Sequence, residues 1–202
     1  MTSQKSDIRI CFFGDSFVNG TGDPAYLGWT GRACAAVDSD EYDLTYYNLG
    51  IRGNTSTQID NRWQLEANLR FTLESDARLV FSFGVNDTRI EAGSVLVDPD
   101  SSITTARRLL SGAKVQYPTL MIGPPPIEDA AANIRIEQTS FAYSDLCAEL
   151  EIPYLETYQP LSQNLIWMQE VAMIDGAHPG AGGYEVLASL VSKWSAWQDW
   201  FS

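Results

Sequence analysis

The stretch Ile8-Arg9-Ile10-Cys11-Phe12-Phe13-Gly14-Asp15-Ser16-Phe17 decides the fold of this chain. It begins as a short apolar run and ends on Gly-Asp-Ser. An apolar run of strand length that stops at a glycine is typical of a strand buried on both faces, as in a parallel sheet. Open α/β sheets bind their ligands at the carboxyl ends of the strands. Ser16 is therefore a candidate functional residue, although Gly, Asp and Ser are also the commonest turn residues.

Apolar runs alternate with helical patterns along the rest of the chain. The further predicted strands cover 44–49, 78–84, 119–123 and 152–155. The predicted helices cover 29–37, 59–69, 102–115, 130–150, 161–170 and a last segment from Pro179 to Trp197. This alternation favours an α/β fold with a parallel sheet, and Pro153 suits a strand at its edge. Since the chain shows neither repeat nor linker, we expect a single domain over residues 1–202.

Composition and charge narrow the class of partner. Apolar residues make up 45% of the chain and charged residues 19%, so a full core can form. The net charge of −13 argues against nucleic acid and anionic membranes, because both are bound through Lys and Arg. No segment is long and apolar enough to cross a bilayer, and residues 1–7 lack the apolar stretch of a signal peptide. We therefore expect a cytoplasmic protein without stable membrane insertion.

The three cysteines, Cys11, Cys34 and Cys147, are odd in number and widely spaced. Because no Cys-x-x-Cys pair is present, they are expected to be small core residues rather than disulfide partners or metal ligands.

The only histidine of the chain is His178, in Asp175-Gly176-Ala177-His178-Pro179. A carboxylate three residues before an imidazole can bend back to accept a hydrogen bond from one ring nitrogen. The other nitrogen is then free to act as a base. Pro179 is well placed as the first residue of a helix, which would anchor this loop.

A serine needs such a base, since its hydroxyl is a weak nucleophile until a neighbour accepts its proton. Acyl transfer also needs donors aimed at the developing oxyanion. The loops after the second and third strands offer the Gly53 amide and the Asn86 carboxamide. These groups and Ser16 all follow strand ends, so they are expected at one rim of the sheet.

These motifs together resemble those of the SGNH (GDSL) hydrolase family, from end to end and in the family's order. Gly14-Asp15-Ser16 is similar to the nucleophile block, Gly53 to the second block, Gly84-Val85-Asn86-Asp87 to the third and Asp175-x-x-His178 to the fifth. Gly50 lies close to Gly53 in the same loop and is the alternative for the second block. The resemblance implies a three-layer α/β/α, flavodoxin-like sandwich whose five parallel strands have the order 2-1-3-4-5.

The same resemblance implies a catalytic triad of Ser16, His178 and Asp175. The oxyanion donors would be the amides of Ser16 and Gly53 and the side chain of Asn86. Phe17 stands where the family motif has leucine, a position that would pack beneath the nucleophile and bear on substrate fit.

The resulting prediction is a serine acyl hydrolase, a carboxylesterase or lipase, that cleaves a small-molecule ester without metal or cofactor. Two alternatives use the same residues or fold: an acyltransferase in which an alcohol replaces water, and a catalytically idle module that binds carbohydrate or another ligand. An ordinary α/β-hydrolase is disfavoured because the Gly-x-Ser-x-Gly elbow is absent.

The C-terminal end is rich in aromatic residues, with Trp194, Trp197, Trp200 and Phe201. Their spacing fits either a helix face packed on the sheet or an exposed patch for a homodimer or an apolar substrate.

Overall fold

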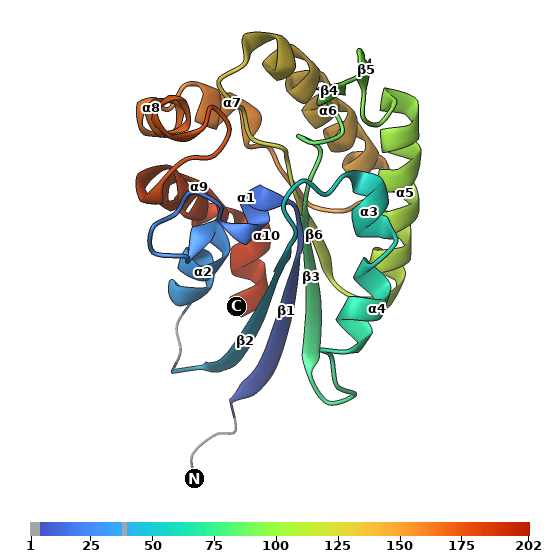
Figure 1. Ribbon diagram of the computed structural model, residues 1–202. Coiled ribbons are helices and arrows are strands. Elements are labelled where there is room, and N and C mark those ends of the chain that lie inside the picture. The colour runs from blue at the N-terminus through green and yellow to red at the C-terminus, as the bar shows by residue number, and fades with distance from the viewer. Residues whose placement is uncertain (1–4, 38–39) are drawn as a thin grey trace.

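Five parallel strands form the central sheet in a computed structural model that describes residues 5–37 and 40–202 (Figure 1). The strands are β1 (Ser6–Gly14), β2 (Tyr42–Gly50), β3 (Asp76–Ser82), β6 (Thr119–Ile122) and β7 (Tyr154–Leu155). Their order across the sheet is β2-β1-β3-β6-β7. Numbered within this sheet, that is the expected order 2-1-3-4-5, so the fold prediction is confirmed. Residues 1–4 lie outside the described residues; they belong to the segment 1–7, in which the sequence shows no apolar stretch of the kind found in signal peptides.

The first strand is buried on both faces, as its apolar run predicted. Its side chains alternate, so that Ile8, Ile10 and Phe12 join the core on one side of the sheet while Cys11 and Phe13 join the core on the other. Burial of each large apolar side chain stabilises the fold by about 1.5–3 kcal/mol. The strand before Ser16 is thus held firmly from both sides.

Helices cover both faces of the sheet. They are α1 (Ser16–Asn19), α2 (Gly28–Ala35), α3 (Ser56–Asp60), α4 (Trp63–Asn68), α5 (Pro99–Gln116), α6 (Ala130–Glu149), α7 (Tyr158–Ser162), α8 (Leu165–Ile174), α9 (Ala181–Lys193) and α10 (Ser195–Gln198), followed by a 3-10 turn at Asp199–Phe201. Figure 1 shows α2, α8, α9 and α10 on one side of the sheet and α3, α4 and α5 on the other. The carboxyl ends of β1, β2 and β3 meet at the same edge, beside α1.

Three predicted helices differ from the structure. The segment 59–69 forms α3 and α4, which are separated at Arg62, whose guanidinium donates to the carbonyls of Gly14 and Leu49. The segment 161–170 spans α7 and α8, because Asn164 begins a new helix by accepting from the amide of Trp167.

The last predicted helix also differs at both ends. It begins at Ala181, after an N-cap at Gly180, so Pro179 lies before the helix and not at its first position. It ends at Lys193, and the extended backbone of the next residue, Trp194, separates α9 from α10. This break places the ring of Trp197 against Phe12 on the sheet, with 6.1 Å between ring centroids.

The C-terminal aromatic residues pack mainly inward. Trp197 is 3% exposed, and Trp194, Trp200 and Phe201 are partly buried against the same core. The cysteines Cys11, Cys34 and Cys147 are buried and free, as expected of core residues. No helix within 5–37 and 40–202 is long and apolar enough to span a membrane.

A short antiparallel hairpin, β4 (Ile90–Glu91) and β5 (Ser94–Val95), follows β3 and was not predicted. Strands of two residues are too short to carry an alternating pattern.

Candidate active site

Ser16 lies at the carboxyl end of β1, where the chain turns sharply into α1. Gly14 is required at this turn, since a Cβ there would lie 2.1 Å from the carbonyl oxygen of Ser82. Asp15 is the N-cap of α1, and its carboxylate accepts a hydrogen bond from the amide of Phe17 at 2.9 Å. The second strand, β2, lies on one side of β1 and the third, β3, lies on the other, so the order of the strands across the sheet reverses at β1. Ser16 follows β1 at this point, which is the usual ligand position in such folds.

Asp175 organises the loop that carries His178. One carboxylate oxygen, Oδ1, accepts from the amides of Ala177 at 3.0 Å and His178 at 2.8 Å, while Oδ2 lies 2.8 Å from the imidazole Nδ1. Partial burial tends to raise the pKa of Asp175, but these three hydrogen bonds outweigh it and lower the pKa to about 2. The carboxylate therefore stays ionised at neutral pH.

The imidazole of His178 links Asp175 to Ser16. Its Nε2 lies 2.7 Å from the Ser16 hydroxyl oxygen. Since an ionised carboxylate can only accept, the proton shared with Asp175 belongs to Nδ1. Nε2 then carries a lone pair and accepts the hydroxyl proton of Ser16. The three side chains thus form one directed hydrogen-bond chain.

Phe17 packs against this chain from below. Its ring centroid lies 5.0 Å from that of His178 and 6.3 Å from that of Trp167. Phe17 is buried, and it lines the same pocket as Ser16 and His178.

The backbone amides of Ser16 and Gly53 remain available as hydrogen-bond donors. Neither Ser16 nor Gly53 donates its amide to an acceptor among the described residues. Gly53 is exposed, has φ of +81°, and an added Cβ would meet no atom within 4 Å, so the space beside its Cα is open. Gly50, which lies close by, is different because its amide already donates to Asn48 Oδ1 at 3.1 Å. Of the two glycines, Gly53 is the one that offers a free donor.

Asn86 lies beside Ser16 but its amide is already engaged. Nδ2 donates to Asp15 Oδ2 and to the carbonyl of Asn54, both at 3.1 Å. An amide nitrogen has two hydrogens, so donation to a third acceptor requires one of these bonds to be shared or exchanged. The next residue, Asp87, fixes this loop by accepting from the amide of Ser56 and the hydroxyl of Ser102.

Asp15 is almost completely buried, and its burial raises its pKa to about 7, against the lowering effect of the hydrogen bonds from Phe17 and Asn86. The nearby charge of Asp87 adds to this rise. A titratable carboxyl group therefore lies next to Ser16 in the sequence and accepts a hydrogen bond from Asn86.

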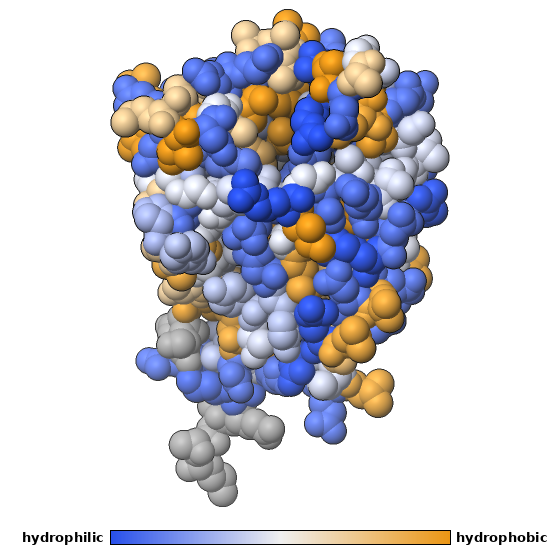
Figure 2. Space-filling view, viewed as in Figure 1, coloured by the Kyte–Doolittle hydropathy of each residue, from blue (hydrophilic) through white to orange (hydrophobic). Residues whose placement is uncertain are grey.

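Ser16, Asn86 and His178 line one pocket of about 510 Å³. Its walls come from the loop after β3, the hairpin strand β4, the start of α6 and the His178 loop; they include Ile90, Ile127, Arg89, Arg135 and Asp129. Figure 2 shows the surface hollowed at this end of the molecule, with apolar residues in the hollow and hydrophilic residues around it. Gly53 does not line the pocket. The next residue, Asn54, accepts a hydrogen bond at its carbonyl from Asn86, which does line it.

Sequence reasoning missed several residues that hold the site. Glu170 on α8 accepts from the amides of Gly180, Gly182 and Gly183 at the start of α9. The glycine-rich stretch after His178 was the available signal for such a close approach, because a Cβ at Gly182 would lie 2.8 Å from a Glu170 carboxylate oxygen. The roles of Asp15 and Asp87 in fixing Asn86 depend on contacts distant in sequence and left no local pattern. Within the described ranges, no group of three His, Cys, Asp or Glu side chains could hold a metal ion.

Comparisons with known proteins add the family. The sequence model of the GDSL-like Lipase/Acylhydrolase family matches residues 12–186. No curated protein sequence matches the chain significantly.

Several solved structures share the fold. A catalytic mutant of Axe2, an acetylxylan esterase from Geobacillus stearothermophilus, is 20% identical with a TM-score of 0.74, over 94% of each chain. The lipase/acylhydrolase from Enterococcus faecalis is 20% identical with a TM-score of 0.69, over 92% of this chain and 94% of that one. A lipolytic G-D-S-L protein from Veillonella parvula is 16% identical with a TM-score of 0.72, over 91% of this chain and 96% of that one.

Proposed function

We propose a serine acyl-enzyme mechanism for this chain, which belongs to the GDSL-like lipase/acylhydrolase family and is an ester-hydrolysing enzyme. The observation that carries the proposal is the hydrogen-bond chain from Asp175 through His178 to Ser16, with distances of 2.8 and 2.7 Å. A serine with a base at this distance, and that base oriented by a carboxylate, is what nucleophilic catalysis requires.

In the first half of the reaction, Ser16 Oγ attacks the ester carbonyl carbon while its proton passes to His178 Nε2. The carbonyl oxygen becomes an oxyanion, which accepts hydrogen bonds from the amides of Ser16 and Gly53 and from Asn86. His178 then gives its proton to the departing alcohol, which leaves the acyl group on Ser16. The ionised Asp175 stabilises the imidazolium formed between these steps.

In the second half, a water molecule attacks the acyl carbonyl and gives its proton to His178 Nε2. The bond between Ser16 Oγ and the acyl carbon breaks, His178 returns its proton to Ser16 Oγ, and the carboxylic acid is released. The ester and one water thus become an acid and an alcohol, and no metal or cofactor takes part.

The structural neighbours support these assignments. The Axe2 structures include catalytic mutants in which a serine, an aspartate or a histidine is replaced by alanine. That aspartate precedes that histidine by three positions, as Asp175 precedes His178. We propose small soluble esters as substrates, with acetyl esters of sugars as the first to try.

Hydrolysis of p-nitrophenyl acetate tests the function. Replacement of Ser16 or His178 by alanine is expected to lower kcat by up to ~10⁶. Equal rates for wild type and Ser16→Ala would contradict the proposal. A panel that runs from acetates to long-chain esters and acetylated sugars then ranks the substrates.

An acyltransferase would use the same residues, with an alcohol in place of water in the second half. Product analysis in the presence of a sugar alcohol separates the two, because transfer gives a new ester in addition to free acid. A cytoplasmic location and a homodimer through the C-terminal aromatic residues stay predictions, which fractionation and sedimentation would test.

A further inference from the structure

The arginines of this acidic chain are almost all paired. Eight of the ten have a carboxylate oxygen within 4.0 Å. The two without such a partner in the described residues are Arg52 and Arg135, and one of them, Arg135, lines the pocket of the candidate active site. Since acidic residues outnumber basic ones by 26 to 13, an arginine left without a carboxylate is unexpected at any position.

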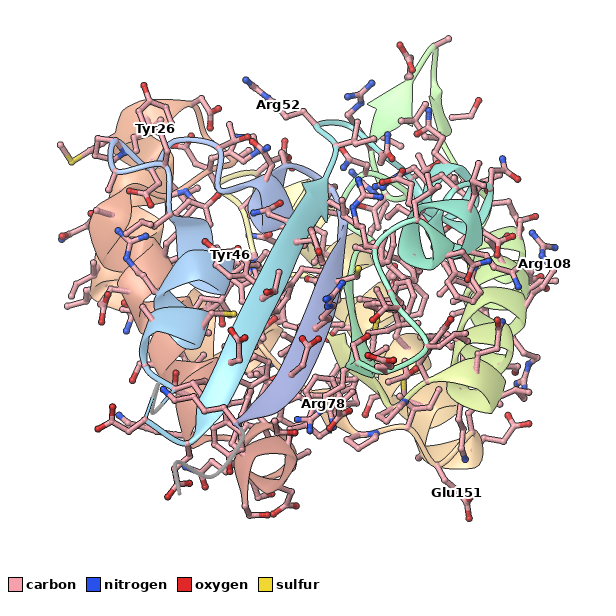
Figure 3. The ribbon with its side chains drawn as sticks, turned by 90° about the horizontal axis from the view of Figure 1, so that it is seen from below. Tyr26, Tyr46, Arg52, Arg78, Arg108 and Glu151 are labelled. Atoms are coloured by element: carbon pink, nitrogen blue, oxygen red, sulfur yellow. The ribbon has the colours of Figure 1, made fainter. Side chains whose placement is uncertain are left out.

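Arg52 precedes Gly53, in the loop after β2, and Figure 3 shows its side chain extending outward into solvent. Arg135 is different, because it lies on α6 and lines the pocket that contains Ser16 and His178. Only Arg135 therefore faces the space that a substrate occupies.

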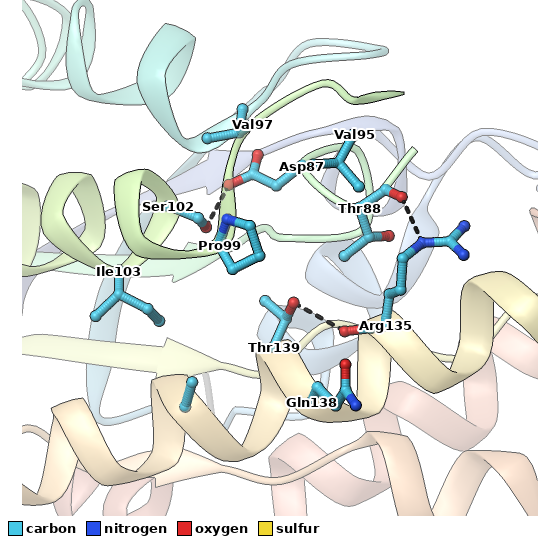
Figure 4. Close-up of a pocket in the computed structure, with 11 residues that line it drawn as sticks. Asp87, Thr88, Val95, Val97, Pro99, Ser102, Ile103, Arg135, Gln138 and Thr139 are labelled. Carbon is cyan, nitrogen blue, oxygen red and sulfur yellow. Dashed lines mark hydrogen bonds between the residues drawn. The ribbon is translucent and has the colours of Figure 1, made fainter. Parts of the chain in front are cut away.

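Backbone carbonyls hold the guanidinium of Arg135 in place. Nε donates to the carbonyl of Thr88 and Nη1 to the carbonyl of Ala131, both at 2.9 Å. Figure 4, a close-up of a second pocket that Arg135 also lines, shows the hydrogen bond that Nε donates to the Thr88 carbonyl, with the terminal nitrogens extending past Thr88. A guanidinium has five N–H groups, so three remain without an acceptor among the described residues. They form a fixed pair of donor positions on Nη1 and Nη2, which matches the two oxygens of a carboxylate.

The other charged groups of the pocket do not neutralise Arg135. Asp129 caps α6 by accepting from the amide of Ala132 at 2.6 Å, and no guanidinium nitrogen of the described residues lies within 4.0 Å of its carboxylate. Arg89 lies 3.6 Å from Glu91, an exposed pair that contributes little. Asp175 is committed to His178. Among the described residues, the guanidinium of Arg135 thus has no carboxylate oxygen within 4.0 Å.

We propose that this pocket binds esters that carry an anionic group, such as a carboxylate, and that Arg135 is the residue that binds the anion. The inference rests on the proposed ester hydrolysis at Ser16. The apolar side chains of Ile90 and Ile127 in the same pocket suit the carbon chain between the anion and the reacting ester. The anion belongs either to the acyl part or to the alcohol part of the ester, and the experiment distinguishes them.

Matched pairs of esters provide the test. For the acyl part, monomethyl glutarate is compared with neutral dimethyl glutarate by pH-stat. For the alcohol part, 4-acetoxybenzoate is compared with neutral 4-acetoxybenzamide by absorbance. Each pair is hydrolysed by wild type, by Arg135→Met and by Arg107→Met. Arg107 is a control of equal charge, because it lies in an exposed pair with Glu149 outside the pocket.

In one of the pairs, Arg135→Met should lower kcat/KM for the anionic ester about 10- to 100-fold more than for its neutral counterpart, as expected on loss of a charge-assisted hydrogen-bonded pair. Arg107→Met should leave the ratio within about twofold, because exposed ion pairs contribute little. The pair that responds identifies the part of the ester that carries the anion. Arg135→Lys retains the charge without the planar fork and is expected to give an intermediate ratio; it serves in place of Arg135→Met if that variant does not fold.

An equal loss on the anionic and neutral esters of both pairs would overturn the inference, because Arg135 would then act only as a brace for Thr88. Such a result leaves the proposed function standing wherever Ser16→Ala still abolishes hydrolysis of the neutral esters. Hydrolysis that survives Ser16→Ala would instead overturn the proposed function itself.

Discussion

Glu170 on α8 accepts a hydrogen bond from the amide of Gly183 on α9 at 2.6 Å. The same carboxylate accepts from the amides of Gly180 and Gly182 at 2.9 and 3.2 Å. The first N–H groups of a helix have no partner within the helix, and a negative charge there is stabilising. The loop that carries Asp175 and His178 runs between these two helices. Glu170 therefore fixes both ends of the loop on which the proposed base depends.

Glu170→Gln should lower kcat of p-nitrophenyl acetate hydrolysis by about tenfold and the free energy of unfolding by about 1–3 kcal/mol, since the charged acceptor is lost. Its KM should change little, because Glu170 does not line the pocket. Steady-state kinetics and urea unfolding measure both effects. Glu185→Gln is the control on α9, since the Glu185 carboxylate is 71% exposed and, among the described residues, forms an ion pair with Arg32 alone. If both variants behaved alike, the brace would have no role in the placement of His178.

Asn86→Ala should lower kcat by about 10²–10³ with little change in KM, because an oxyanion donor acts mainly in the transition state. The bonds of Asn86 to Asp15 and Asn54 hold its side chain beside Ser16, and one of them must give way as the oxyanion forms. Steady-state kinetics tests this, with a thermal unfolding curve to show that the fold is intact. Loss of affinity with kcat unchanged would indicate that Asn86 only binds substrate.

Asp175→Asn should lower kcat by about 10⁴, since an amide at this position favours the wrong tautomer of His178. The pKa of Asp175 is about 2, so its carboxylate is ionised in the wild type at every pH from 5 to 8. The loss should therefore be equally large across this range, because the wild-type carboxylate keeps the same charge throughout it. Rates measured at several pH values check this; a loss that shrinks toward pH 5 would contradict it.

Asp15→Asn should change how stability depends on pH. The pKa of Asp15 is about 7 in the folded protein and near ~3.9 in the unfolded chain. Between these values the folded state keeps a proton that the unfolded state has released, so wild-type stability falls as pH rises from about 4 to about 7. Asparagine does not titrate, so the stability of Asp15→Asn relative to wild type should rise over this interval. Urea unfolding of both proteins at pH 4.5 and 7.5 measures this stability difference. If the difference were the same at both pH values, the raised pKa of Asp15 would be contradicted.

The strands of the central sheet and the pairing of Asp175 with His178 could be predicted because their signals are local, whereas the link from His178 to Ser16, 162 residues away, was implied by the family resemblance. The apolar run of β1 indicates a buried strand, and Asp175 lies only three positions before His178, so one loop joins them. Helix ends were harder. The break at Trp194 and the split at Arg62 serve contacts with Phe12 and with the carbonyl of Gly14, which lie far away in sequence.

The surroundings of the site could not be predicted for the same reason. Asn86 was identified as a donor, but its bond to Asp15 depends on two strand ends that meet only in the folded sheet. Arg135 belongs to a helix whose pattern indicates only burial on one side. The absence of a carboxylate next to Arg135 in the described part of the chain could not be predicted, because it depends on where the folded chain places its Asp and Glu side chains.

The most direct measurement of the mechanism is mass spectrometry after treatment with a fluorophosphonate. A serine activated by a neighbouring base attacks phosphorus and displaces fluoride, which leaves a stable phosphonyl group on its oxygen. We predict one adduct per chain, on the peptide that contains Ser16, with activity lost in proportion and no adduct on Ser16→Ala. A Ser16→Ala protein that still hydrolyses p-nitrophenyl acetate, or an inactivating adduct at another residue, would contradict a nucleophilic role for Ser16.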